Sequence, residues 1–190
     1  MTLPSLGVWC ELALGGLVLS AGTCSGGRRS WVATRRAGDT RPMTRRERLI
    51  AERLGRGRSR KEIGHELGLS MTTLGRAIDH AAEKIGTTTM DLVLLSAAFG
   101  PGGGHGDVTA IDDDHCTLHA PLDATETWTR FSLAEREVVE LALEGLSSTG
   151  IAARRGDRSE RTIANQLAHV FRKAEVSGRA ELAARLLAAL

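Results

Sequence analysis

One stretch of this 190-residue sequence occurs twice, and the repeat constrains the fold more than any other feature does. Residues 43–48 (MTRRER) align with residues 131–136 (FSLAER), an offset of 88 positions. The offset is 89 between Leu74 and Ile163 and keeps that value to Lys84 and Lys173. Matches on both sides of a one-residue insertion indicate an internal duplication of one structural unit. We call residues 43–98 the first unit and residues 131–190 the second unit.

Each unit divides into four predicted helices. The first helix begins at a capping box, in which a hydroxyl accepts from the backbone and a glutamate three residues later reaches back. The boxes pair Thr44 with Glu47 in the first unit and Ser132 with Glu135 in the second. Glycines then end these helices near residues 55–57 and at residue 145. The other predicted helix starts are Ser59, Ser70 and Thr88 in the first unit and Ser147, Ser159 and Ser177 in the second.

The third helix of each unit carries a single apolar stripe. Its apolar positions are spaced by four, three and four residues, which is typical of an amphipathic helix with one buried face. A short helix, a glycine-containing turn and such a longer helix form a helix-turn-helix, whose longer helix enters the DNA major groove. The alternative is a pair of small helical bundles that bind no ligand. The stripes are Leu74, Ile78, Ala81 and Ile85, and Ile163, Leu167, Val170 and Ala174.

Specific motifs favour the helix-turn-helix. In the second unit they are Ser132-x-x-Glu135-Arg136-Glu137, Gly145-Leu146-Ser147, Ile151-Ala152, Ser159 to Ile163, Phe171-Arg172-Lys173, Val176-Ser177 and Arg179 to Leu182. With them, residues 131–187 resemble the LuxR/GerE-type helix-turn-helix of bacterial transcription regulators. The first unit is similar to the same family over residues 43–95, through Lys61-Glu62-Ile63 and Leu67-Gly68-Leu69-Ser70. The resemblance implies a mainly α fold of two tandem LuxR-type four-helix units. It also implies a DNA-binding transcriptional regulator, with double-stranded DNA as its partner and RNA polymerase as a further candidate.

Residues off the apolar stripe of the third helix are expected to face DNA. Arg76 is suited to two hydrogen bonds with guanine and Asn165 to two with adenine, and such a contact discriminates by ~1–3 kcal/mol. Lys84 and Lys173 suit contact with phosphates or, alternatively, complement the helix C-terminus. The candidate DNA-binding residues are Thr72, Thr73, Arg76, His80 and Lys84, and Arg161, Thr162, Asn165, His169, Arg172 and Lys173. For the two histidines, an exposed side chain without a role is an equal alternative.

Each unit departs from the family pattern in a different place. The first unit has Gly75 and Asp79 on its reading face, where the glycine costs ~1 kcal/mol against alanine and the carboxylate repels phosphates. The second unit has Ala164 and Ala168 there, and an extra residue in its turn (155–158, RGDR). We expect the second unit to bind DNA, because its reading face has no acid. The departures leave an alternative function: a protein-interaction module that keeps the fold and does not bind DNA.

The last helix of each unit is the expected dimer contact. The fourth helix often has this role in the family, and residues 178–190 place Leu182, Leu186, Leu187 and Leu190 on one side. The implied assembly is a homodimer or, because both units lie in one chain, an intramolecular pseudo-dimer. Such a pseudo-dimer would contact two half-sites one helical turn apart.

Short β-prone runs precede both units. Residues 17–21 and 30–34 flank Gly26-Gly27, and residues 107–111 and 116–119 flank three aspartates, so each segment predicts a hairpin. An isolated two-stranded ribbon is marginally stable, so the hairpins need to pair with each other or pack on helices. A short helix is expected over residues 5–15. The predicted organisation is therefore an N-terminal segment (1–42), the first unit (43–98), a Gly/Asp-rich linker (99–130) and the second unit (131–190).

Charge and composition limit the other function classes. The sequence has 25 Lys and Arg against 23 Asp and Glu, a net charge of +2 that is low for a DNA-binding domain. No apolar run reaches the ~18–20 residues of a membrane helix, and no basic residues precede the first apolar stretch, so we expect a cytoplasmic protein. His105, His115, Cys116 and His119 fit no standard zinc spacing. Neither a metal, a cofactor nor an enzymatic activity is expected, because phosphate-binding loops and activated nucleophiles are missing from the sequence.

Overall fold

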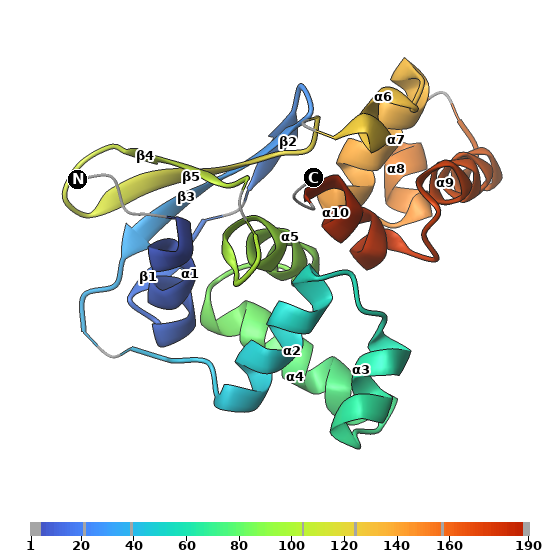
Figure 1. Ribbon diagram of the computed structural model, residues 1–190. Helices are drawn as coiled ribbons and strands as arrows, with labels where there is room; N and C mark the ends of the chain where they lie inside the picture. The colour runs from blue at the N-terminus through green and yellow to red at the C-terminus, as the bar shows by residue number, and fades with distance from the viewer. Residues whose placement is uncertain are drawn as a thin grey trace.

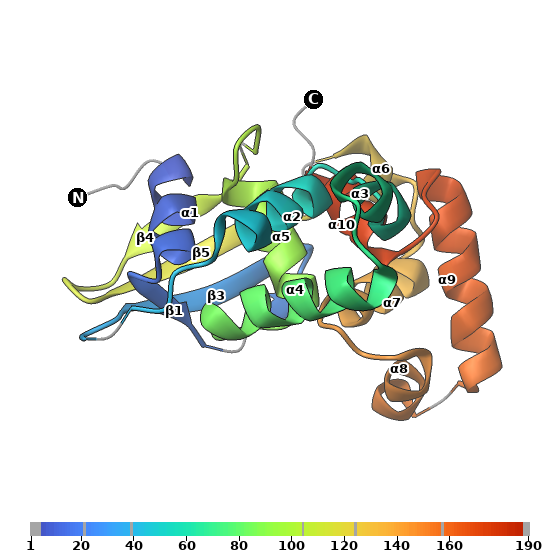
Figure 2. The ribbon, with the colours of Figure 1, turned by 90° about the horizontal axis from the view of Figure 1, so that it is seen from below.

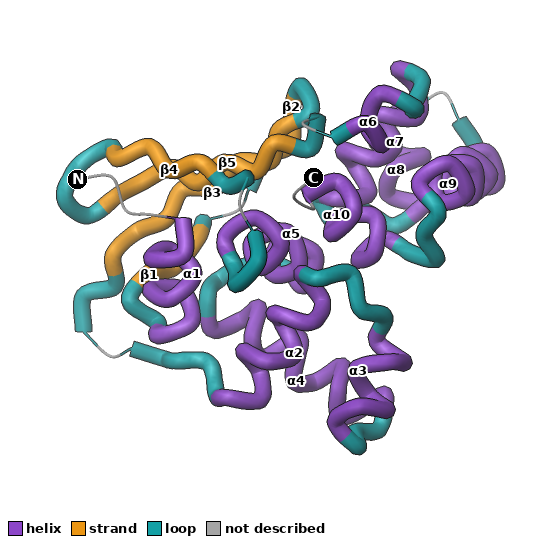
Figure 3. Tube along the Cα trace, viewed as in Figure 1, coloured by secondary structure: helices purple, strands orange, loops and turns teal. Residues whose placement is uncertain are grey.

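The chain forms helices around one small antiparallel sheet (Figures 1 and 3). The computed structural model describes residues 5–20, 22–38, 40–103, 105–123, 125–156 and 158–187. The described residues combine helices with an antiparallel sheet, so the architecture is mixed and the mainly α prediction is confirmed only in part. Ala21 of the first predicted strand, Asp157 of the second turn and Leu190 of the last predicted helix lie outside the described residues.

The sheet gathers strands from both segments that precede the units. Its order is β1-β3-β5-β4, and β2 pairs with the same edge of β3 as β1 does. A helix precedes it, as predicted for residues 5–15. These elements are α1 (Ser5–Leu14), β1 (Leu17–Leu19), β2 (Thr23–Ser25), β3 (Arg28–Arg35), β4 (Asp107–Ala110) and β5 (His115–Pro121).

The first predicted hairpin is confirmed, with a tight turn at the two glycines. Ser25 pairs with Arg28, so that only Gly26 and Gly27 connect the strands. Both glycines have positive φ, at 58° and 74°, as the two-residue hairpin turn of type I′ requires. Residues other than glycine rarely adopt this backbone conformation. The Gly-Gly pair therefore fixes the position of the turn and, with it, the register of β2 on β3.

Pairing of β3 with β5 joins the two predicted hairpins into one sheet. Trp31 lies opposite Leu118 at the centre of this pair, and both side chains are buried. Val108 of β4 continues the same face beyond Leu118. The second predicted hairpin, within the linker, is therefore confirmed as β4 and β5, and both strands belong to the sheet. The sheet stabilises two ribbons that would each be marginal alone.

The first unit contains the four helices that its capping residues predict. Both of its capping boxes, at Thr44 and Ser59, are present. The third helix buries its predicted stripe, including Leu74 and Ile78, and leaves the opposite face exposed. The helices are α2 (Arg45–Gly55), α3 (Arg60–Leu67), α4 (Met71–Lys84) and α5 (Thr89–Phe99).

The second unit repeats this arrangement, preceded by one turn of helix that the sequence analysis did not predict. The capping box at Ser132 is present, and Ser147 and Ser159 cap the next two helices. The elements are α6 (Glu126–Thr129), α7 (Leu133–Leu143), α8 (Ser148–Arg155), α9 (Glu160–Ala174) and α10 (Arg179–Leu187).

The last helices of the two units pack on each other inside the chain. In Figure 1 α10 lies beside α5 at the middle of the molecule, and α10 also contacts α2. Leu182 and Leu186 of α10 belong to the same buried apolar cluster as Leu92 and Leu95 of α5. One hydrophobic core therefore extends from the sheet through the first unit to the end of the second.

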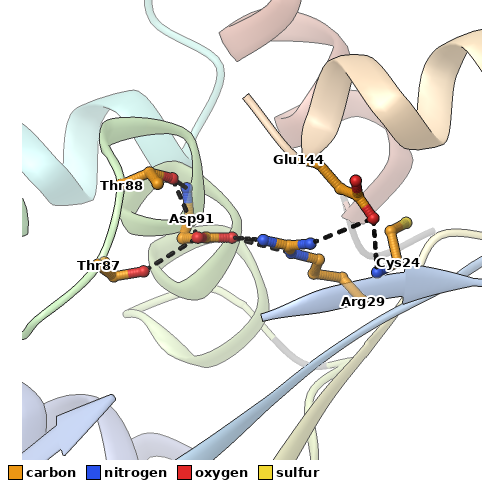
Figure 4. A network of polar contacts seen from close by, with 6 residues as sticks. All are labelled: Cys24, Arg29, Thr87, Thr88, Asp91 and Glu144. Atoms are coloured by element: carbon orange, nitrogen blue, oxygen red, sulfur yellow. Dashed lines mark hydrogen bonds and ion pairs between the residues drawn. The ribbon is translucent and has the colours of Figure 1, made fainter. Parts of the chain in front are cut away.

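A buried ion pair connects the sheet to the first unit (Figure 4). Arg29 of β3 donates from Nε and Nη2 to Asp91 Oδ1 of α5, at 2.9 and 2.7 Å, and only 2% and 1% of the two residues is exposed. The hydroxyls of Thr87 and Thr88 donate to Asp91 Oδ2, each at 3.0 Å. The charge of Asp91 is thus compensated on both oxygens, which a buried carboxylate requires.

Two glutamates, one in α7 and one at its C-cap, hold the second unit on the same sheet. Glu140 Oε1 accepts from the Gly27 N–H at 2.7 Å, and Glu144 Oε1 accepts from the Cys24 N–H at 3.2 Å. Glu144 also lies 3.9 Å from Arg29 Nη1, so the arginine stands between carboxylates of both units. Burial, reinforced by Glu140, raises the pKa of the Cys24 thiol to about 12. The thiol therefore stays protonated and unreactive at neutral pH.

Candidate nucleic-acid interface

The predicted reading face of the second unit is the exposed side of α9. Its buried stripe is the predicted one, from Ile163 to Ala174, and Phe171 and Gln166 are half-buried beside it. Ser159 caps the helix, and its hydroxyl hydrogen-bonds the Thr162 hydroxyl at 3.0 Å. Thr162 is half-buried. The remaining candidate residues of this unit are exposed: Arg161, Asn165, His169, Arg172 and Lys173.

The first unit places its candidates in the corresponding positions on α4. Ser70 caps this helix, and its hydroxyl hydrogen-bonds the Thr73 hydroxyl at 2.9 Å. Asp79 and Met71 share the exposed surface, so the face carries an acid and an apolar side chain. The exposed candidates are Thr72, Thr73, Arg76 and His80, and Lys84 is half-buried.

Both candidate lysines form ion pairs within the protein that were not predicted from the sequence. Lys84 Nζ lies 2.7 Å from Glu47 Oε2, and Lys173 Nζ lies 2.6 Å from Glu135 Oε2. Both glutamates are the acceptors of the capping boxes, so each lysine ties the last turn of the third helix to the start of the first. The signal was present in the sequence, because both members of the pair are repeated in the two units.

These ion pairs alter the titration of the capping carboxylates. Burial alone would raise the pKa of Glu135, but hydrogen bonds from Lys173 and from the Ser132 backbone and hydroxyl outweigh it and lower the pKa. Glu47 follows the same pattern with Lys84 and Thr44. The charged carboxylates therefore stabilise the fold above the unfolded-state pKa of about 4.3. This contribution is lost as the pH falls through the lower pKa of the folded state.

We expect Glu135→Gln to lower the free energy of unfolding by about 1–2 kcal/mol at pH 7, because it removes a capping acceptor and an ion pair. Urea unfolding at pH 7 and near pH 3 measures the effect, and the difference from wild type should shrink at the lower pH. Glu47→Gln should lower the free energy of unfolding in the same way, because Glu47 makes the equivalent contacts with Thr44 and Lys84. Glu83→Gln is the matched control, since the side chain of this exposed residue of α4 makes no capping bond. An equal loss in the control would refute the assignment.

Arg155 explains how the second unit tolerates its unusual turn. It occupies the place of Leu67, whose apolar side chain is half-buried in the first unit. Its Nη2 lies 3.1 Å from Glu137 Oε2, and its Nη1 donates to the Ala134 carbonyl at 3.3 Å. These contacts hold α8 to the start of α7. The expected weakness of this turn is therefore offset by polar contacts.

The charges along α8–α9 and along α3–α4 differ. Residues 148–174 of the second unit contain six basic and two acidic side chains, whereas residues 60–84 of the first contain four of each. Of the six, Arg155 and Lys173 are paired with Glu137 and Glu135 of α7. Arg154 in the last turn of α8 and Arg158 in the turn before α9 are exposed and were not among the candidates. With Arg161 and Arg172, they give this pair of helices four exposed arginines. An excess of positive charge is what contact with a phosphate backbone requires.

The third helices of the two units lie on different sides of the molecule. In Figure 1 α4 runs along the lower part of the chain and α9 lies at the right-hand edge. Figure 2 again shows them apart and pointing in different directions. Two half-sites of one straight duplex face the same side of the DNA. The pseudo-dimer hypothesis needs both helices to meet one duplex, and it stays a prediction.

Comparison with known proteins gives no relative for this chain. No protein-family model matches it, and no curated protein or solved structure matches it either. Within the described residues, no three histidine, cysteine or acidic side chains come together to form a metal site. Every helix in that part of the chain is too short or too polar to cross a bilayer. The interface must accordingly be judged on its geometry and charge.

Proposed function

We propose that this protein is a DNA-binding transcriptional regulator of the LuxR/GerE type, and that the second unit binds the DNA. In this proposal α9 enters the major groove, Arg161 and Asn165 face base edges, and Arg154 and Arg172 lie over phosphates. The observation that carries the proposal is the excess of positive charge along α8 and α9, where Arg154, Arg161 and Arg172 are exposed. The first unit, with balanced charge on its equivalent surface, serves as the partner on which the second unit packs.

The packing of α5 on α10 bears on the number of DNA sites per chain. It uses the helix faces that would otherwise pair two separate chains, and it leaves α4 and α9 on different sides. We therefore favour one recognition helix, and one half-site, for each chain. The exposed Ala164 and Ala168 on α9 support the rival function, a protein-interaction module without DNA binding, because neither side chain can hydrogen-bond a base.

A salt titration of binding to random duplex DNA tests the proposal. We expect the affinity of the wild type to fall steeply with salt, because each phosphate contact releases counterions. Arg154→Ala/Arg172→Ala should flatten the slope of log affinity against log salt by up to about 2, because both arginines are placed over phosphates. Arg60→Ala/Arg76→Ala is the matched control, since it removes two exposed arginines from the first unit, and its slope should equal that of the wild type.

Three results would overturn parts of this proposal. If wild type fails to bind DNA at low salt, the interaction-module function replaces it. If only Arg60→Ala/Arg76→Ala weakens binding, the first unit is the one that binds DNA. A footprint of the bound complex that covers two half-sites one turn apart for a single chain would restore the pseudo-dimer.

A further inference from the structure

A cavity of about 730 Å³ opens between α1 and α2, on the first-unit side of the molecule. The apolar part of its lining comes from Trp9, Ala13 and Leu14 of α1 and from Leu49 of α2. The loop that follows α5 closes one end, and Figure 2 shows this loop standing between α1 and α2. The cavity is remote from α9, so the inference drawn from it does not depend on the proposed function.

Helix geometry explains why the space exists. α1 packs on α5 and β1, while α2 packs on α4 and α5, so both helices rest on α5 without closing on each other. The α2 residues that line the cavity are spaced by three and four positions and form one face of that helix. Leu14 leaves 58% of its surface exposed and Leu49 is half-buried, while Trp9 and Ala13 are only 2% exposed and belong to the core. An apolar wall is therefore available to a ligand.

The polar part of the lining is cationic. Arg45 and Arg48 stand at the exposed rim, and neither has an ion-pair partner among the described residues. The one carboxylate of the lining is that of Glu52, whose Oε1 accepts from Trp9 Nε1 at 3.4 Å. Two guanidiniums thus outnumber one carboxylate that already has a partner. A guanidinium pair over an apolar cleft is complementary to a carboxylate or a similar anion.

We propose that this cavity binds a small amphipathic anion. Its alkyl chain or aromatic ring lies between Trp9 and Leu49, and its anionic head group lies at Arg45 and Arg48. The apolar body gains from removal of its surface from water, and the head group gains charge-assisted hydrogen bonds. Specificity for an anion over a neutral analogue comes from the two arginines.

Titration of the full chain with octanoate and 1-naphthoate tests this, with octanamide as the neutral analogue. The three tryptophans give three indole N–H signals in a two-dimensional NMR spectrum, and Trp9→Phe identifies the one that belongs to Trp9. We expect at least one of the two anions to shift the Trp9 signal while Trp31 and Trp128, which lie outside the cavity, stay in place. Octanamide should bind about tenfold more weakly than octanoate.

Two variants and a matched control locate the head group. Arg45→Gln/Arg48→Gln should weaken binding of the anion by about tenfold or more, which is the scale of one lost charged contact. Leu14→Glu should abolish it by placing a carboxylate at the mouth. Arg46→Gln is the control, because this exposed arginine of α2 does not line the cavity. All substituted side chains except Trp9 are exposed, so the fold is retained.

The proposal fails if neither anion moves the Trp9 signal at about 10 mM, beyond the millimolar Kd of very weak complexes. It also fails if octanamide binds as tightly as octanoate, or if Arg46→Gln weakens binding as much as Arg45→Gln/Arg48→Gln does. The first result would show that the cavity does not bind the anions, and the other two would show that Arg45 and Arg48 do not select for the anionic head group.

Discussion

Arg29→Met is expected to lower the free energy of unfolding by about 3–5 kcal/mol, the cost of removing one member of a buried ion pair. The substitution keeps the apolar volume of the stem and leaves the Asp91 carboxylate buried, with only the Thr87 and Thr88 hydroxyls as side-chain donors. Chemical unfolding followed by circular dichroism measures the loss. Arg29→Met also removes the guanidinium that lies between Asp91 and Glu144, so the amides of both units should lose protection from hydrogen exchange.

A second substitution separates lost charge from lost packing. Without the guanidinium, the charge of Asp91 is buried with no cation beside it, which is the costly state of a broken ion pair. Adding Asp91→Asn should therefore recover part of the loss. Arg28→Met, at an exposed neighbouring position of β3, is the control, and a loss that Asp91→Asn leaves unchanged would contradict the charge argument.

The sequence predicts the helices well because their signals are local. A capping box joins residues three positions apart, and the boxes at Thr44, Ser59 and Ser132 all form. The stripes of α4 and α9 follow from the helical period alone. Where a local signal is weak, prediction failed: α6 follows Thr125, whose side chain makes no capping hydrogen bond.

The sequence predicted that the two hairpins pair with each other or pack on helices, but it did not specify which strands or side chains meet. Nothing in either hairpin specifies that β3 and β5 become partners, because many short β-prone runs offer the same hydrogen-bonding groups. Arg29 and Asp91 are 62 residues apart and were not singled out. A duplication shows which features are shared by the two units, but it does not show how one unit packs on the other.

For the candidate interface, sequence reasoning predicted exposure better than partnership. The period of α9 correctly placed Arg161 and Asn165 on the open face. It gave no partner for Lys173, whose ammonium lies on Glu135 of another helix, 38 residues away. It also left out Arg154 and Arg158, since they belong to the preceding helix and the turn. Surfaces formed by several elements require the tertiary structure.

Leu186→Ala is expected to lower the free energy of unfolding by about 2–5 kcal/mol, because a fully buried leucine leaves a cavity that its neighbours fill only in part. Leu186 lies in α10, but its apolar cluster includes α5 of the first unit. If one core spans both units, the loss should appear in both. Native-state hydrogen exchange measures it, and the amides of α5 and α10 should lose protection by the same amount.

The opposite outcome would describe a different molecule. If α10 amides lose protection and α5 amides do not, the units fold independently, and the α5–α10 contact is too weak to fix the direction in which α9 points. Leu133→Ala provides the matched control, since this leucine of α7 is 78% exposed and its loss should stay within about 0.5 kcal/mol of the wild type. A shared loss would mean that the first unit stabilises the second through this contact. The first unit would then have a structural role that does not require its own reading face to contact DNA.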